Sequence, residues 1–203
     1  MIMFGMEITK DDLFIGEKVL ISKNANSVIK LNDFGLKGLS NSIEKAMTII
    51  GFAGKEAIGG QLHLTNYRLI FKSHPANRVK GKFSIFLNTI KSVKDTSILI
   101  SKKIEVLTIS QKYEFVIWGV PNFINELESA KQTLDKDKLK YITEMITKDY
   151  KKIGQGFEHF KELDILLRAM PKITEVIQDP LSLSSIVNVY EIFEIIKKDR
   201  VEM

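Results

Sequence analysis

The hydrophobic positions divide the chain into two parts with different periods. From about residue 17 to residue 118, apolar residues come in short runs, many of them alternating with polar residues and separated by Gly, Asn, Asp and Pro. This pattern predicts β-strands. The predicted strands are 18–22, 27–31, 61–65, 68–72, 83–87, 97–100, 104–109 and 113–117, with a turn at 23–26. Seven or more short antiparallel strands at this spacing favour a sandwich or a barrel.

The second part has helical spacing. After Gly119-Val120-Pro121, where proline suits the first turn of a helix, Phe123, Leu127, Ala130 and Leu134 predict an amphipathic helix that could plug an open barrel end. Apolar stripes predict three further helices, at about 139–153, 157–170 and 182–198. We therefore expect an α+β protein in which a β domain precedes a helical extension of about three helices.

The composition is that of an ordinary globular protein, with 44% hydrophobic and 27% charged residues. The absence of cysteine excludes a disulfide scaffold, a thiolate nucleophile and any Cys-ligated zinc or iron–sulfur site. No signal peptide is evident, and no apolar stretch approaches the roughly 20 residues that span a bilayer. We expect a cytoplasmic protein that reaches membranes only peripherally.

Four segments, taken in order, resemble the GRAM domain, a pleckstrin-homology-like module. They are Gly16-Glu17-Lys18-Val19-Leu20, residues 60–71 (GQLHLTNYRLIF), residues 83–87 (FSIFL) before 90–93 (IKSV), and residues 113–116 (YEFV). The resemblance covers about residues 14–134. It implies a bent antiparallel β-barrel capped by one helix, and a noncatalytic module that often associates with membrane lipids or protein partners.

The same resemblance implies where the core lies but transfers no ligand site. It places Leu62, Leu64, Leu69 and Phe71 in the core and makes Thr65-Asn66 a turn. Two stretches depart from the family pattern: an insertion at residues 34–59 and the helical extension at residues 135–203. The expected organisation is thus a GRAM-like barrel domain over 14–134 followed by the extension over 135–203.

The positive charge is concentrated in one segment. The whole chain has 30 Lys and Arg against 25 Asp and Glu, whereas residues 72–103 have eight basic residues and one acidic residue, Asp95. Such a segment attracts phosphates, anionic lipid surfaces or acidic proteins, and it also fits a solvated face that keeps the protein soluble. Only four of the basic residues are arginine, which argues against sequence-specific nucleic-acid binding.

The loop at residues 72–82 is the best candidate anion site, because its basic side chains could converge on a headgroup at a barrel mouth. The candidate residues are Lys72, His74, Arg78, Lys80 and Lys82. Arg78, Lys80 and Lys82 would point the same way in an extended chain, and His74 would add charge at acidic pH. A solvated cationic loop is the alternative interpretation.

The insertion contains an amphipathic segment. Asn41 followed by Glu44 fits a capping box. Its candidate membrane or partner contacts are Leu36, Leu39, Ile43, Met47, Ile50 and Phe52. One interpretation is an interfacial helix; the one we favour is a helix packed on the barrel or on the tail, because its polar face is not strongly basic.

Signals for catalysis are weak. There is no P-loop and no Gly-x-Ser-x-Gly, and the three histidines are scattered without metal-ligand spacing. We expect His63, Glu105 and Glu114 to face outward from strands, and Trp118 to pack at a barrel end. No enzyme activity, metal or cofactor is expected.

Two functions remain open at this point. The first is a noncatalytic module that binds anionic membrane lipids through the basic loop. The alternative is a protein-interaction or scaffold domain whose residues 135–203 bind a partner or a second copy of the chain.

Overall fold

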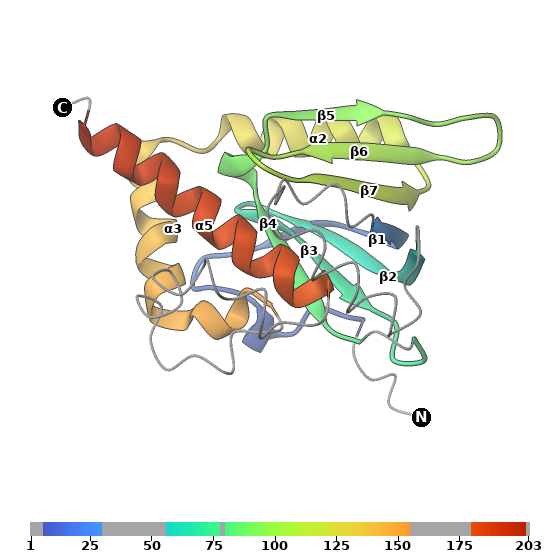
Figure 1. Ribbon diagram of the computed structural model, residues 1–203, viewed down its shortest axis with the longest axis horizontal. Coiled ribbons are helices and arrows are strands. Elements are labelled where there is room, and N and C mark those ends of the chain that lie inside the picture. Colours follow the sequence, from blue (N-terminus) through green and yellow to red (C-terminus); the bar gives the residue numbers. More distant parts are fainter. Residues whose placement is uncertain (1–5, 30–55, 78–79, 155–179, 202–203) are drawn as a thin grey trace, which may run out of the picture.

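The computed structural model describes residues 6–29, 56–77, 80–154 and 180–201, which form an α+β structure (Figure 1). The strands are β1 Val19–Ile29, β2 Glu56–Thr65, β3 Arg68–Ser73, β4 Lys82–Phe86, β5 Ser92–Asp95, β6 Lys103–Leu107 and β7 Lys112–Ile117. The α-helices are α2 Val120–Gln132, α3 Lys136–Asp149 and α5 Pro180–Val201, and the short 3₁₀ helices are η1 Lys10–Asp12, η3 Leu87–Thr89 and η4 Tyr150–Lys152.

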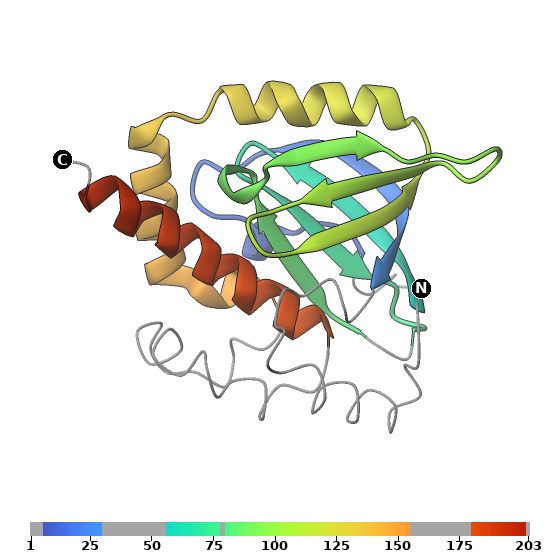
Figure 2. The same cartoon turned by 45° about the horizontal axis from the view of Figure 1, so that its top comes forward.

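The seven strands form one antiparallel sheet in the order β4-β3-β2-β1-β7-β6-β5. The sheet is strongly bent, and α2 runs along its β5–β6 side (Figure 2). Among the described residues β4 and β5 are the two edges, so the sheet curls without closing its hydrogen-bond ladder. The α+β, pleckstrin-homology-like fold class expected from the sequence is confirmed.

The predicted turn at residues 23–26 is wrong, because these residues lie inside the single long strand β1. Ala25 pairs with Gly60 of β2 on one side and with Ile117 of β7 on the other. Hydrogen-bonded ladders on both sides outweigh the local turn preference of Asn24 and Asn26. Residues 56–59 of the expected insertion are also strand, forming the start of β2.

The main core fills the bend of the sheet beneath α2. The aromatic rings of Phe71, Phe83 and Phe115 meet there, with centroids 5.4–6.2 Å apart. The helix contributes Phe123 and Leu127, which are fully buried as their spacing predicted. The core positions implied by the family resemblance, Leu62, Leu64, Leu69 and Phe71, are all 0% exposed.

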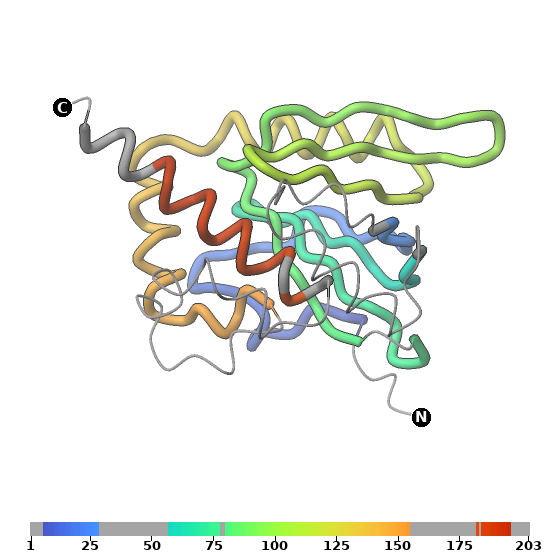
Figure 3. Tube along the Cα trace, in the orientation of Figure 1, coloured from blue at the N-terminus to red at the C-terminus, as the bar shows by residue number. Residues whose placement is uncertain are grey.

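A second apolar layer covers the opposite face of β3 and β4. α5 lies across β4, as the trace in Figure 3 shows, and α3 and the segment before β1 complete the layer. Its buried members include Phe14, Tyr67, Phe86, Ile142, Ile146, Ile153, Ile186, Val189 and Ile192. The described part of the tail therefore packs on the barrel, and the helix expected at 157–170 lies outside the described residues.

This second layer overturns the prediction that His63 faces solvent. The side chain is 2% exposed, and its ring nitrogens hydrogen-bond with Ser22 Oγ and the Met6 carbonyl, each at 2.8 Å. Burial lowers the pKa of His63, and the nearby Lys72 charge lowers it further. Strand alternation predicted the side of the sheet correctly, but the N-terminal segment covers that side.

A buried ion pair joins the second layer to the sheet. Arg68 is 0% exposed and makes a two-point contact with Glu17, at 2.8 Å from Nε to Oε1 and 2.9 Å from Nη2 to Oε2. Its other N–H groups donate to Ser84 Oγ and to the carbonyls of Asp12 and Lys152. All five guanidinium N–H groups therefore have acceptors, which is the condition for burying this charge.

Gly154 allows the tail to approach β4 closely. A Cβ atom at this position would lie 2.8 Å from the Lys82 carbonyl oxygen and would collide with the Ser185 side chain of α5. The absence of a side chain thus brings together η4, β4 and α5 at one point.

Candidate functional site

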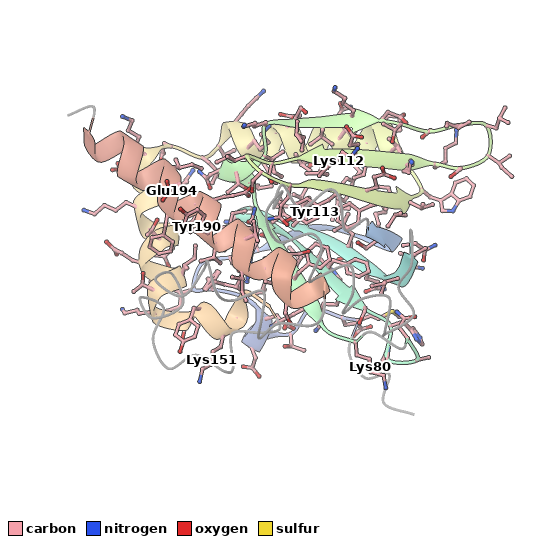
Figure 4. All side chains as sticks on the ribbon, viewed as in Figure 1. Lys80, Lys112, Tyr113, Lys151, Tyr190 and Glu194 are labelled. Carbon is pink, nitrogen blue, oxygen red and sulfur yellow. The ribbon has the colours of Figure 1, made fainter. Side chains whose placement is uncertain are left out.

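The basic loop predicted as an anion site connects β3 to β4. Lys72 and Lys82 are directly opposite each other in the two strands, while His74 and Lys80 are exposed in the connection (Figure 4 labels Lys80). Arg78 lies outside the described residues, so the alignment expected for Arg78, Lys80 and Lys82 stays a prediction. The structure thus brings Lys72 and Lys82 together and leaves His74 and Lys80 facing solvent.

The two paired lysines already have an anionic partner within the chain. Asp12 of η1 accepts from Lys72 Nζ at 2.9 Å and from Lys82 Nζ at 2.7 Å. Burial favours the neutral carboxyl, but hydrogen bonds from Lys82, Lys72 and the Thr9 N–H outweigh it and hold the pKa of Asp12 well below its ordinary value. The carboxylate of Asp12 therefore occupies the position between the two ammonium groups.

The connection between β3 and β4 is anchored to β2. The His74 N–H donates to the Gly59 carbonyl at 2.8 Å, and the Asn77 side-chain amide donates to the same oxygen. His74 Nδ1 accepts from the Ala76 N–H at 3.0 Å. These bonds hold the described part of the loop against the start of β2. Lys80 is not part of the ion-pair cluster formed by Asp12, Lys72 and Lys82, which we call the Asp12 cluster.

The apolar candidates Leu36, Leu39, Ile43, Met47, Ile50 and Phe52 lie outside the described residues. Their assignment to a membrane or partner contact therefore stays a prediction.

The hairpin formed by β5 and β6 was missed as a candidate surface. Residues 97–100 were predicted as a strand, but they form the end of this hairpin, where Ile98 and Ser101 bridge across a tight turn. Ile98, Leu99 and Ile100 are 71%, 91% and 89% exposed. The apolar composition of residues 97–100 is typical of a strand. Their assignment to a turn follows from the bridge between Ile98 and Ser101, which the sequence does not reveal.

The prediction for Trp118 is also wrong. This side chain was expected to pack at a barrel end, yet it is 71% exposed directly after β7. The Ile117 N–H donates to the Lys102 carbonyl at 3.0 Å, so Trp118 directly follows a residue bonded to the projecting part of the β5–β6 hairpin. An exposed tryptophan next to three exposed aliphatic residues forms an apolar surface at this end of the molecule.

The prediction that Glu105 and Glu114 face solvent is wrong for Glu114, which is buried, and Glu105 is only partly exposed. Glu114 is 5% exposed and bonds with Lys103 Nζ at 3.0 Å, whereas Glu105 is half-buried with Lys112 Nζ at 3.7 Å. Glu105 and Glu114 lie directly opposite each other in β6 and β7, and each is within ion-pair distance of a lysine on the neighbouring strand, which offsets the repulsion between the two carboxylates.

A buried carboxyl on α5 was not anticipated from the sequence. Glu191 accepts from Thr108 Oγ1 at 2.8 Å, from the Ser110 N–H and Oγ at 2.6 Å, and from Asn188 Nδ2 at 2.8 Å. Burial raises the pKa of Glu191, and these hydrogen bonds oppose that rise. The cluster secures α5 to the turn between β6 and β7, which is a structural role.

The described residues offer no metal centre and no membrane-spanning helix. They contain no cluster of three His, Cys, Asp or Glu side chains arranged to hold a metal ion. None of the described helices is long and apolar enough to cross a membrane.

Comparison with known proteins finds a family match within the β domain. Residues 54–119 match the GRAM domain family. The match confirms the resemblance carried by the segments from Gly60 to Phe71 and from Tyr113 to Val116. The GRAM domain is a noncatalytic, pleckstrin-homology-like module often linked to membrane or lipid binding.

The other comparisons add little. The crystal structure of the C-terminal domain of an unknown protein from Leishmania infantum aligns with 59% of this chain and 88% of its own, at 19% identity and a TM-score of 0.40. A search of curated proteins found no match.

Proposed function

We propose that this protein is a noncatalytic membrane-binding module that associates with anionic lipid headgroups through the basic loop between β3 and β4. The residues we assign to headgroup binding are Lys72, His74, Arg78, Lys80 and Lys82. The GRAM match supports the class of function, and the arrangement of charge supports the choice of ligand. Sites of this kind bind phosphate groups mainly through lysine point charges, in keeping with the scarcity of arginine.

The observation that carries the proposal is a group of exposed lysines with a single exposed carboxylate, Asp95, in the described residues of the loop and hairpin, whereas the exposed lysines of α3 are accompanied by the exposed Asp137 and Glu144. Lys80 of the loop and Lys94 and Lys102 of the hairpin are exposed, and both features lie toward the end of the long axis opposite α3 and the C-terminus (Figures 1 and 2). Cations grouped at one end orient a protein on a negative surface. Each lysine held near such a surface contributes roughly 1 kcal/mol.

The ion pairs of Asp12 with Lys72 and Lys82 determine which loop residues are available to bind a headgroup. Lys72 and Lys82 together carry two positive charges against the single charge of Asp12, so the cluster keeps an excess positive charge beside Lys80. A lipid phosphate would approach Lys80 and His74 first, because they are exposed.

The test is co-sedimentation of the whole chain with phosphatidylcholine vesicles, with and without phosphatidylserine. We expect binding only when phosphatidylserine is present, and we expect it to weaken with salt as the Debye length falls from about 10 Å at 0.1 M to about 3 Å at 1 M. Salt-insensitive binding, or equal binding to both vesicles, would contradict an electrostatic mechanism.

A matched pair of charge reversals locates the surface. Lys80→Glu should weaken vesicle binding roughly tenfold, whereas Lys151→Glu, an exposed lysine of η4 far from Lys80 in Figure 4, should change it little. Lys82 is unsuitable for this purpose because reversing it would place two carboxylates together at Asp12. Equal effects of the two reversals would point to a nonspecific response to net charge.

A protein-interaction role for residues 135–203 remains the alternative. The described helices of this region place Ile142, Ile146, Ile186 and Ile192 against the sheet, so these side chains serve the fold of a single chain. Concentration-dependent mass in solution that is lost on mutation of exposed tail residues would favour the alternative.

A further inference from the structure

We propose that the tip of the β5–β6 hairpin is a membrane-inserting wedge, in which Ile98, Leu99 and Ile100 enter the acyl region of an anionic bilayer and Trp118 lies at the interface. This inference rests on the proposed membrane function and assigns the part of the protein that penetrates the lipid.

The exposure of the tip is unusual within this protein. Three consecutive aliphatic side chains are between 71% and 91% exposed, and Trp118, which follows the residue bonded to Lys102, is 71% exposed. Isolated exposed apolar residues are common, but a contiguous group of them marks a binding surface. In Figures 1 and 2 the hairpin projects past the end of α2 and beyond the other strands.

The backbone of the turn adds an independent argument. Ile98 and Ser101 exchange hydrogen bonds of 3.0 and 2.9 Å, so Leu99 and Ile100 form a two-residue hairpin turn. Leu99 has φ of 49°, a left-handed conformation that turns usually assign to Gly, Asn or Asp. Leucine in this conformation lowers the stability of the fold. Burial does not compensate for the loss, because the side chain is 91% exposed. A role in contact with another apolar phase accounts for this choice of residue.

The dimensions fit shallow insertion. The last ladder pair of the hairpin is Asp95 with Ile104, and the turn lies four residues beyond it, so the tip extends about 10–13 Å past the ladder at the rise of a β-strand. Peripheral apolar surfaces enter the headgroup and acyl boundary by about 5–10 Å. The tip can therefore reach the acyl chains while the sheet stays in water.

The charges flanking the tip favour a bilayer over other apolar partners. The exposed Lys94 lies in β5, and the exposed Lys102 directly precedes β6 and is two residues, or about 7 Å, from Ile100. Asp95 is the one nearby exposed carboxylate of the hairpin, and it accepts from the Ser97 N–H at 2.9 Å. Lysines behind an apolar tip would lie at the level of anionic headgroups while the tip is inserted.

The size of the surface also argues against a protein partner. Three aliphatic side chains and one indole present a few hundred Å² on a convex turn, well below the roughly 1,200 Å² buried in stable protein interfaces. A bilayer needs no complementary surface and accepts a narrow wedge.

The single tryptophan of the chain provides a direct measurement. Trp118 emission should shift to shorter wavelength when the whole protein is titrated with phosphatidylcholine–phosphatidylserine vesicles, and lipids brominated in the acyl chains should quench it. If the protein sediments with these vesicles but the emission neither shifts nor is quenched, the wedge is wrong and the headgroup proposal stands. If it does not sediment with them, both proposals fail.

Substitutions separate insertion from folding. The variant I98S/L99N/I100S keeps Trp118 and the lysines, and it should lower vesicle binding about tenfold or more. The control Ile15→Ser removes an aliphatic side chain that is 72% exposed near α3, and it should leave binding unchanged. Equal binding by the triple variant and the wild type would overturn the proposal. So would a concentration-dependent blue shift without vesicles, since that result assigns the tip to a second copy of the chain.

Discussion

The β3–β4 pair and the β5–β6 hairpin have similar sequence patterns but differ in how far their apolar side chains are buried. Both contain apolar runs with lysines nearby, but β3 and β4 are covered on both faces, whereas the tip of β5–β6 is covered on neither. The residues that cover the outer face of β3 and β4 are distant in the sequence: they come from Phe14 before β1, from α3 and from α5. Burial of an apolar run is therefore decided by what packs against it.

Polar groups differ between the two regions in the same way. Around β3 and β4, Arg68, Asp12 and His63 are buried with specific partners. At the hairpin, Lys94 and Lys102 remain exposed. The charged side chains of the paired strands β3 and β4 have partners within the fold, whereas Lys94 and Lys102 of the hairpin face solvent, as Lys80 of the loop does.

The largest expected effect comes from the buried arginine. Arg68→Met should destabilise the protein by about 3–5 kcal/mol, because it leaves the Glu17 carboxylate buried without its cation. Chemical denaturation followed by circular dichroism measures this loss. The exposed control Lys151→Met should change stability by less than about 0.5 kcal/mol. A comparable small change for Arg68→Met would mean that the second layer does not depend on this pair.

A substitution at Gly154 tests whether β4 depends on the close packing of the tail against it. Gly154→Ala should cost about 1–3 kcal/mol, because a methyl group would press on the Lys82 carbonyl and on Ser185. Hydrogen exchange should show the loss of protection first in β4 and α5. Uniform loss of protection over the whole sheet, including β6 and β7, would contradict the separation of the two regions.

Asp12 allows a prediction with a pH dependence. Its pKa is lower in the folded protein than its ordinary value of 3.8, so its contribution to stability is complete above that value and is lost as pH falls below it. Asp12→Asn should cost about 1–3 kcal/mol at neutral pH, and the difference from the wild type should shrink in acid. A difference that stays constant as pH falls below 3.8 would contradict this assignment.

The same variant sharpens the comparison of the two regions. Asp12→Asn removes the anion between Lys72 and Lys82, so binding to phosphatidylserine vesicles should increase if the basic loop is the headgroup site. Sedimentation measured beside the unfolding curve distinguishes this gain from a loss of folded protein. Unchanged binding by a folded Asp12→Asn variant would count against Lys72 and Lys82 as lipid ligands.

The smallest effect is expected at the turn of the hairpin. Leu99→Asn should raise stability by about 1 kcal/mol, because asparagine tolerates the left-handed conformation that strains leucine. A melting curve measures the change, and sedimentation of the same variant should show weaker vesicle binding. Higher stability with weaker binding is the combination that a wedge predicts; a loss of stability would show that Leu99 supports the fold.

Period and composition were enough to predict most strands, the helix after Gly119, and the apolar stripes of α3 and α5. These features depend on local alternation, on Pro121 and on helical spacing, all of which are properties of nearby residues. The core positions Leu62, Leu64, Leu69 and Phe71 followed from the same alternation together with the family resemblance. The basic character of residues 72–103 was likewise readable directly.

Tertiary structure alone decided which of these residues are covered. The turn expected at 23–26 became strand because β2 and β7 bond to it from both sides, and His63 is buried because the N-terminal segment lies over it. The partners of Lys72 and Arg68 are Asp12 and Glu17, more than fifty residues away. Local pattern specifies the elements, whereas long-range packing specifies exposure, and exposure determines which charges and apolar side chains can meet a membrane.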